Sequence, residues 1–557
     1  GGSASLNGGT FTAAITNAGI FKHNSTANQT LSGVISGTGA LVKDNTGTLT
    51  LSGANSYSGT TTVSAGTLTL NYATQDNSKL SNTAALTLAG NTLTLAGGTH
   101  TEVVGETILS AGTASTVTRT SGTSVLQMNE ITRNAGASLD FGAASIANTD
   151  TLNTNGILGA WATINATDFA MNSTNGADGD ITAYNSYTDV ARLTPGTIAD
   201  GSTTNVRILE GSGSAGNITL GAATTTVNTL NQSVSGGTGG ATIDTASNTL
   251  QTNGILVGTG AGDLTIGTAV DSGTLKSATS GGELVLQNFG NLTINAVIAD
   301  NTTASSVMKA GSGTATLSGA NTYTGTTTVY AGTLSLNNEN ALQNSTLDTG
   351  TSGSQQVTFG AGANYNIGGL KGADDLVLSG GKNIFVGSNN SDTTYSGVLN
   401  VVSGGGGTLT KVGDGTLTLS GANTHTATYI GIANGADAGT VSIEKNSALG
   451  LDRVEFGAGG TVNLGVDGLV VNNNFYIYNR TSNNDRIIRL DLDGSNTGVL
   501  TGFFDIRKTG VFAADVGADD TLTFSGQLRT GAGSGGLTKN GLGTLVLTNR
   551  SNSYAGG

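Results

Sequence analysis

Residues Gly39–Leu70 read GALVKDNTGTLTLSGANSYSGTTTVSAGTLTL, and the fold can be inferred from this stretch. Two Leu-x-Leu pairs, Leu49/Leu51 and Leu68/Leu70, stand 19 residues apart on either side of a segment rich in Gly, Asn, Ser and Thr. Alternating leucine and threonine predict short strands with one buried face. The interval predicts that the second pair stacks on the first as the next turn of a coil, with the intervening Gly-Ala-Asn forming a corner.

The same text returns three times further along the chain. With their flanking residues, the four copies span 31–70, 297–336, 397–443 and 526–557. In the first three copies a lysine stands ten residues before the glycine of Gly-Ala-Asn. In the third, the apolar pair Val441/Ile443 follows Leu417/Leu419 by 24 residues, which predicts a loop of five extra residues. Such repeats indicate one continuous solenoid over 1–557.

The composition favours a solenoid of strands over a set of globular domains. The chain has 557 residues, more than one globular core supports, with 89 Gly, one Pro, no Cys and only 10% charged residues. Glycine supplies corners that need positive φ, and the near absence of proline suits an unbroken ladder of hydrogen bonds. Sparse charge avoids repulsion between equivalent positions of stacked strands. Because no window keeps a 3.6-residue apolar period, we expect an all-β protein.

The alternation is least regular over residues 159–200, where we expect an insertion or a bulky turn of the solenoid. This region holds the only tryptophan, Trp161, together with Tyr184 and Tyr187. Large aromatic side chains are enriched where proteins bind partners, so these three are candidates for surface recognition. The alternative interpretation is that they pack in the core or at a corner.

A second candidate surface is the most charged segment, Phe475–Asp493, which reads FYIYNRTSNNDRIIRLDLD. Its apolar and charged residues alternate, so one face is apolar and the other is charged. Arg486, Arg489 and Asp491 are the candidate recognition residues here, and with Asp485 they form the only set that could serve a carbohydrate-active site. A solvated strand face is the alternative interpretation.

We predict no catalytic, cofactor-binding or metal-binding residues. The adjacent acids Asp374-Asp375 and Asp519-Asp520 stand in Gly/Ala/Asp turns, and neighbouring residues of a strand point to opposite faces, so neither is a natural catalytic pair. The three histidines are isolated and no cysteine accompanies them, which leaves a zinc site without support.

The charge and hydropathy pattern limit the partners. A net charge of −14 argues against nucleic acid, which requires a basic surface. No apolar run approaches the roughly 20 residues of a membrane helix, so we expect no membrane span in this segment. The sequence starts without Met and stops inside the fourth copy, and we expect it to be a fragment of a longer chain.

The four copies resemble the autotransporter-associated β-strand repeat, also called the passenger-associated transport repeat, of Gram-negative autotransporters and giant surface proteins. The pattern is Lys-x-Gly-x-Gly-Thr-Leu-Thr-Leu-Ser-Gly-Ala-Asn, and the first copy departs from it with Asn45-Thr46 where glycine is usual. The resemblance implies a right-handed parallel β-helix whose repeats assist folding and type V secretion. At about 20 residues a rung, the chain would form roughly 25–28 rungs of an elongated rod.

We therefore expect a secreted or surface-displayed, non-catalytic structural or adhesive passenger of a Gram-negative bacterium. Its expected partners are cell-surface or matrix components, including polysaccharide, and further copies of itself in fibres. No cofactor is expected. The alternatives are a carbohydrate-active β-helix enzyme, which would need charged residues from several rungs in one groove, and a toxin-like passenger, which would need an exposed apolar patch.

Overall fold

The computed structural model describes residues 8–233, 239–350, 356–378, 380–401, 406–431, 438–457, 459–477, 486–491, 494–506, 511–530 and 535–553. These residues form strands and turns, with no helix among them. Nearly all neighbouring strands pair in parallel, so the chain is a parallel β-solenoid, and the predicted all-β solenoid is confirmed.

The solenoid is made of two arms, and the first runs from β1 to β19. One of its sheets stacks β1 (Gly9–Phe11), β4 (Gln29–Leu31), β7 (Thr48–Leu51), β9 (Thr67–Asn71), β11 (Thr92–Ala96), β14 (Ala114–Ser121), β17 (Ser138–Phe141) and β19 (Ala162–Ile164). The second stacks β3 (Ile20–Asn24), β6 (Ala40–Asp44), β8 (Thr61–Val63), β10 (Leu86–Leu88), β13 (Thr107–Leu109) and β16 (Ile131–Arg133). Shorter ladders pair β2 (Ile15–Thr16) with β5 (Ile35–Ser36) and join β12 (Thr101–Val103), β15 (Val125–Gln127) and β18 (Ala147–Thr149).

The second arm begins at β22 and runs to β61. Its longest sheet contains β22 (Thr188–Leu193), β24 (Gly201–Gly211), β26 (Thr224–Gln232), β28 (Thr249–Gln251), β29 (Gly254–Val257), β31 (Thr274–Lys276), β32 (Glu283–Asn288), β34 (Val297–Ile298), β35 (Ser306–Ala310), β37 (Thr327–Val329), β39 (Leu342–Asp348), β41 (Asn364–Lys371), β43 (Asn383–Val386), β46 (Thr408–Lys411), β48 (Ala427–Ile430), β50 (Arg453–Phe456), β53 (Asn474–Ile477), β56 (Phe504–Ile506) and β59 (Leu528–Thr530).

Four further ladders complete the second arm. The first is β23 (Thr197–Ile198), β25 (Asn217–Leu220), β27 (Ala241–Asp244), β30 (Leu264–Ile266), β33 (Leu292–Ile294), β36 (Thr314–Leu317), β38 (Thr333–Leu336) and β40 (Gln356–Phe359). The second pairs β42 (Leu376–Val377) with β45 (Leu399–Asn400). The third is β44 (Thr393–Tyr395), β47 (Gly413–Leu419), β49 (Ala438–Ile443), β51 (Thr461–Leu464), β54 (Arg486–Leu490), β57 (Val511–Val516) and β60 (Gly536–Asn540), and the fourth is β52 (Leu469–Val471), β55 (Thr497–Leu500), β58 (Thr521–Phe524) and β61 (Thr544–Leu547).

The leucine pairs of the repeat stack as predicted. Leu49 of β7 lies in register with Leu68 of β9, and Leu51 with Leu70. All four are fully buried, because inward residues of successive turns cover one another while the alternate threonines face outward. A turn buries only its few inward side chains, so each depends on its neighbours for stability.

The predicted rung length is too short. Leu68 and Leu93 are in register at an interval of 25 residues, and Leu93 and Val117 at 24, so the 19-residue interval of the repeats is the compact extreme. The solenoid has about 21 turns of roughly 24 residues, fewer than the 25–28 that a uniform 20-residue rung gives. Longer corners between strands account for the difference. In the third copy, Leu417 pairs with Val441 as its spacing predicted.

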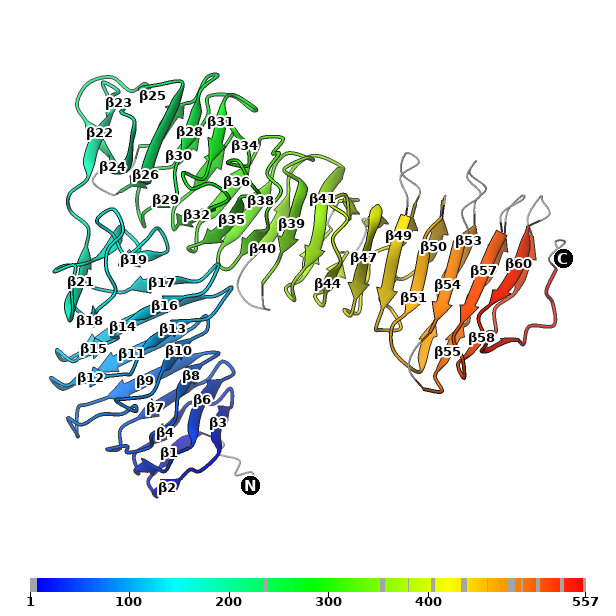
Figure 1. Ribbon diagram of the computed structural model, residues 1–557, viewed down its shortest axis with the longest axis horizontal. Coiled ribbons are helices and arrows are strands. Elements are labelled where there is room, and N and C mark those ends of the chain that lie inside the picture. The colour runs from blue at the N-terminus through cyan, green and yellow to red at the C-terminus, as the bar shows by residue number, and fades with distance from the viewer. Residues whose placement is uncertain are drawn as a thin grey trace.

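The stack of turns changes direction once, between residues 162 and 188. Here β19, β20 (Asp168–Asn172) and β21 (Gly179–Ala183) pair antiparallel, and β21 also pairs antiparallel with β18. In Figure 1 the first arm (blue to cyan) ends at this meander, and the second arm (green to red) starts beyond it and runs off at an angle. The end of the first arm therefore meets the side of the second.

Several predicted segments fall partly outside the described residues. These are 402–405, 432–437, 531–534 and 554–557 of the third and fourth copies, and 478–485 and 492–493 of the charged segment.

Candidate functional site

The lysine of each repeat points inward and binds backbone carbonyl groups. Lys309 Nζ donates to the carbonyl oxygens of Ala310 at 2.9 Å, Gly311 at 2.6 Å and Ala331 at 2.9 Å. Burial lowers the pKa of Lys309 to about 7. The carbonyl of Ala331 belongs to the next turn of the solenoid, so this side chain ties two turns together through groups that would otherwise lack donors.

The same arrangement recurs in the first and third copies. Lys43 Nζ binds the carbonyl oxygens of Asp44, Asn45 and Ala65 at 2.6–2.9 Å. Lys411 Nζ binds two turn carbonyls at 2.7 Å. Burial lowers the pKa of both lysines to about 8, although Asp44 and Asp414 respectively oppose the shift.

The asparagine of Gly-Ala-Asn links the turn before it to the turn after it. Asn321 Oδ1 accepts from the backbone N–H of Ile298 at 2.8 Å, and Asn321 Nδ2 donates to the carbonyl oxygen of Ala341 at 3.0 Å. Asn55 and Asn423 make the equivalent pair of bonds in their copies. Each repeat thus carries two buried polar side chains that fix the stacking of three turns.

A second feature is the elbow where the two arms meet. The outer face of the second arm carries an apolar patch there, made by Leu256, Val285, Met308 and Ala310, all buried. Ala160 of the first arm packs against this patch. The two arms therefore share an apolar interface, in addition to the core inside each.

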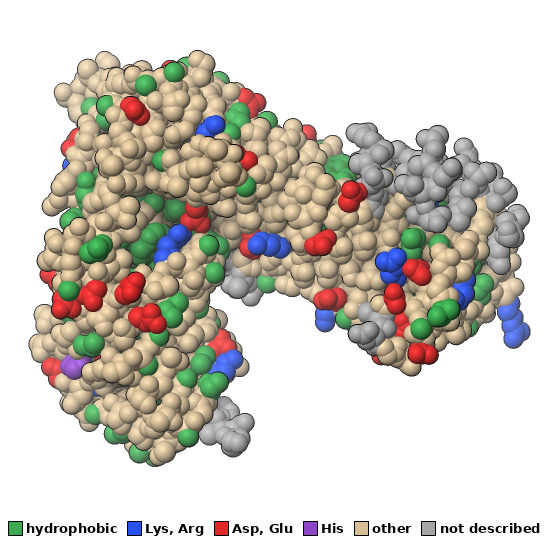
Figure 2. Space-filling model, in the orientation of Figure 1, with side chains coloured by type: hydrophobic (Ala, Val, Ile, Leu, Met, Phe, Trp, Pro, Cys, Tyr) green, Lys and Arg blue, Asp and Glu red, His purple; other side chains and the backbone are tan. Residues whose placement is uncertain are grey.

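Polar contacts surround the apolar part of the elbow. Arg133 forms an ion pair with Glu283 at 2.5 Å, and both side chains are about one fifth exposed. Gln287 Nε2 donates to the carbonyl oxygen of Trp161 at 2.9 Å. Figure 2 shows acidic and basic side chains gathered in the inner corner between the arms. These contacts couple residues more than 120 positions apart in the sequence.

The three aromatic candidates lie at this elbow, mostly turned inward. Trp161 is 9% exposed and belongs to the core of the first arm. Tyr184 and Tyr187 are half-buried and pack edge to face, with ring centroids 4.7 Å apart. Burial raises the pKa of Tyr187, whose hydroxyl accepts hydrogen bonds from Phe169 N and Asn231 Nδ2. These contacts support the packing interpretation for all three.

The three charged candidates are separated by the fold. Arg486 is 3% exposed, and its Nε donates to the carbonyl oxygen of Gly457 at 2.8 Å inside the arm. Arg489 faces outward and pairs with Asp515 at 3.0 Å, while Asp491 is exposed at the end of β54. Asp485 lies outside the described residues. The expected alternation holds at Ile488 and Leu490, which are fully buried.

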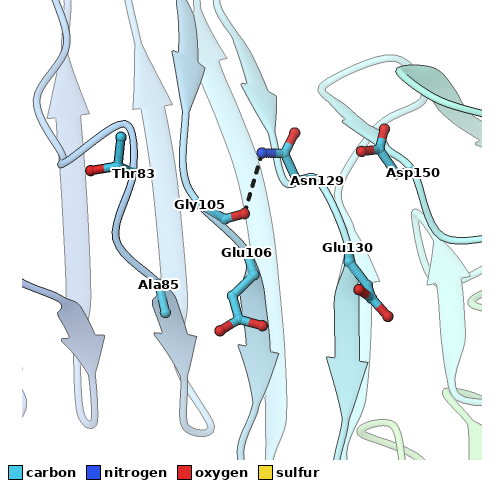
Figure 3. Close-up of a pocket in the computed structure, with 7 residues that line it drawn as sticks. All are labelled: Thr83, Ala85, Gly105, Glu106, Asn129, Glu130 and Asp150. Carbon is cyan, nitrogen blue, oxygen red and sulfur yellow. Dashed lines mark hydrogen bonds between the residues drawn. The ribbon is translucent and has the colours of Figure 1, made fainter.

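A shallow acidic groove of about 480 Å³ lies on the first arm. Glu106 and Glu130 directly precede Thr107 and Ile131, which are in register, so the two acids occupy equivalent places on neighbouring turns. Figure 3 shows their carboxylates pointing the same way, with Asp150 on the following turn. Adjacent like charges repel, which suits their exposed setting. Among the described residues no group of His, Cys, Asp and Glu could hold a metal ion.

Comparisons with known proteins connect these features to a family. A sequence model of the passenger-associated transport repeat matches residues 41–70, 308–336, 409–431 and 537–557. The chain is also similar to the adhesin BmaC autotransporter of Brucella suis biovar 1 (strain 1330), with 31% identity over 520 residues. The chain is an autotransporter passenger with passenger-associated transport repeats. The match covers 90% of this passenger and 14% of that adhesin, and no solved structure matches the passenger.

The passenger contains functional side chains that sequence reasoning left without a role. The spacing of the repeat lysine was evident, but nothing in the spacing showed that the side chain turns inward. The elbow patch left a clearer signal. In β29, β32 and β35 apolar residues stand next to one another instead of alternating, as in strands buried on both faces. Within the described residues, no helix of the passenger is long and apolar enough to cross a membrane.

Proposed function

We propose that the passenger is a rigid, non-catalytic segment of a surface-displayed adhesin of a Gram-negative bacterium. The observation that carries this proposal is the 31% identity to an autotransporter adhesin over 90% of the chain. The solenoid architecture supports it, because a stack of turns holds a binding surface away from the cell without a large globular core. Cell-surface or matrix components, including polysaccharide, are the proposed partners, and assembly into fibres is proposed with them.

The repeats serve folding in this proposal. Lys309 and Asn321 satisfy buried carbonyl and N–H groups of three successive turns, so a repeat can order its neighbours when it forms. A chain that emerges unfolded outside the cell would benefit from a few such strong turns, from which the rest of the solenoid propagates. Adhesion itself would then depend on the surfaces between the repeats.

Adherence of cells that display the passenger tests the proposal. A non-adherent laboratory strain would carry the passenger fused to a heterologous translocator, and the same strain with the translocator alone is the control. We expect adherence to matrix-protein or polysaccharide coatings above the control. Equal adherence on every coating, with display verified by antibody, would overturn the adhesive function.

The non-catalytic part has its own test. Purified passenger incubated with a panel of polysaccharides should release no products. Arg486 and Arg489 point to opposite sides of β54, which argues against the enzyme alternative at the charged segment. Turnover of any polysaccharide would favour that alternative.

A further inference from the structure

A crevice of about 350 Å³ opens where the two arms meet, and it is built by both. The first arm contributes the glycine turns at Gly112 and Gly136, from successive turns of its solenoid. The second arm contributes Tyr330, Asp348 and Lys371. Because its walls come from segments that only the elbow brings together, the crevice has a shape that a straight solenoid would lack.

The charged groups of the crevice are present as neutral pairs. Glu283 is paired with Arg133 at 2.5 Å, and Asp348 is paired with Lys371 at 3.2 Å. Two carboxylates and two cations leave no net charge to attract an ion. Carboxylates accept hydrogen bonds from hydroxyl groups, and lysine donates them, so the set suits an uncharged ligand with many hydroxyls.

Hydroxyl groups and one aromatic ring complete the lining. Ser306, Thr326 and Thr328 line the crevice, and each hydroxyl can both donate and accept. Tyr330 is half-buried, and its ring lies against the glycine turns of the first arm: a Cβ at Gly136 would fall 2.2 Å from Tyr330 Oη. The volume is at the small end of ligand pockets, which run from about 300 to 1,000 Å³.

We propose that this crevice binds a neutral mono- or disaccharide unit of a glycan. The inference deepens the adhesive function proposed above and rests on it, because it names a ligand class and a place on the passenger. Paired carboxylates bind neighbouring sugar hydroxyls, Thr and Ser hydroxyls bind others, and the tyrosine offers a ring edge to the sugar. A sialylated or otherwise acidic glycan would meet Glu283 and Asp348 unfavourably.

Binding of the purified passenger to a printed array of neutral and sialylated oligosaccharides tests the inference, with affinities then measured by titration of the free sugar. Asp348→Asn removes the carboxylate charge but keeps an oxygen that can accept from Gly350 N, as Asp348 does at 2.9 Å. Ala111→Trp places a bulky side chain at the exposed rim of the crevice. Glu106→Gln, in the acidic groove, is the matched control.

We expect a neutral glycan to bind, roughly tenfold or greater loss of affinity in both crevice variants, and unchanged affinity in the control. No binding to any neutral glycan, preference for sialylated glycans, or equal affinity in all three variants would each overturn the inference. Adherence of displaying cells without saccharide binding would overturn this inference alone. Saccharide binding without adherence would overturn the adhesive function alone.

Discussion

The ammonium nitrogen of Lys309 lies 2.9 Å from the carbonyl oxygen of Ala331, one turn further along the solenoid. The same nitrogen binds the carbonyl oxygens of Ala310 and Gly311, so one fully buried side chain satisfies three acceptors on two turns. A buried cation is costly unless it is well bonded, and here the backbone of the corner supplies all the acceptors. The repeat thus concentrates stability at particular turns.

Replacing this lysine tests its role in stacking. Lys309→Met keeps the length of the side chain and leaves three buried carbonyls without donors. We expect a loss of roughly 2–4 kcal/mol, with reduced amide protection centred on β35, β37 and β39 in hydrogen exchange. Lys539→Met is the control, because Lys539 occupies the same place in the fourth copy but is exposed, and it should cost less than about 1 kcal/mol. Equal effects at both sites would contradict the stapling role.

The pKa of Lys309 predicts how that cost depends on pH. Burial lowers the pKa to about 7 in the folded chain, against about 10.4 for an unfolded lysine. Below pH 7 the side chain is charged in both states, and the penalty for burying the charge is complete. Between pH 7 and 10 the folded state has lost the proton and the unfolded state has kept it, so stability rises with pH.

The stability difference between wild type and Lys309→Met isolates this effect from all other groups. We expect the difference to grow by up to about 1.4 kcal/mol per pH unit between pH 7 and 10. Denaturant unfolding of both proteins at pH 7, 8 and 9 measures it. A difference that stays constant, or shrinks as the pH rises, would show that the folded chain retains the proton.

The sequence was sufficient to predict the elements that local pattern controls. Leu49 and Leu68 stack because the text itself repeats, and Leu417 and Val441 pair across a longer corner for the same reason. The average turn length could not be predicted, because the repeats from which it was estimated are the shortest turns. Corners elsewhere have no common text, so their lengths follow from tertiary packing alone.

The candidate sites were less predictable than the fold. Trp161 and Arg486 are residue types common in binding surfaces, but both are buried by contacts that depend on distant segments. The elbow joins Arg133 to Glu283 across 150 positions, and nothing in the local sequence of either residue specifies the other. Adjacent apolar residues such as Leu284 and Val285 were the available sign that one strand would be covered on both faces.

The bridging asparagine allows a test that needs no charge change. Asn321→Ala leaves the N–H of Ile298 and the carbonyl of Ala341 unpaired in the interior, and we expect a loss of roughly 2–4 kcal/mol. Thr322→Ala, at the exposed neighbouring position, should change stability by less than about 0.5 kcal/mol. Asn321→Asp keeps the acceptor but sets a carboxylate against the carbonyl of Ala341, so it should be worse than alanine at pH 7 and recover towards it at pH 4. Thermal or denaturant unfolding of the three variants gives the order, and indifference to Asn321→Ala would exclude the bridging role.

The fit between Gly136 and Tyr330 predicts how the angle between the arms can be changed. Gly136 has φ of 73°, and a Cβ there would fall 2.2 Å from Tyr330 Oη, so Gly136→Leu both strains the turn and forces the arms apart. Gly468→Leu is the matched control, because Gly468 has the same φ but no atom within 4 Å of the added Cβ. Small-angle X-ray scattering should show a larger maximum dimension for Gly136→Leu than for wild type, and no change of shape for Gly468→Leu. If the elbow were held mainly by the β19–β21 meander, the Gly136→Leu profile would superimpose on that of wild type, and the docking of the arms would contribute little to the bend.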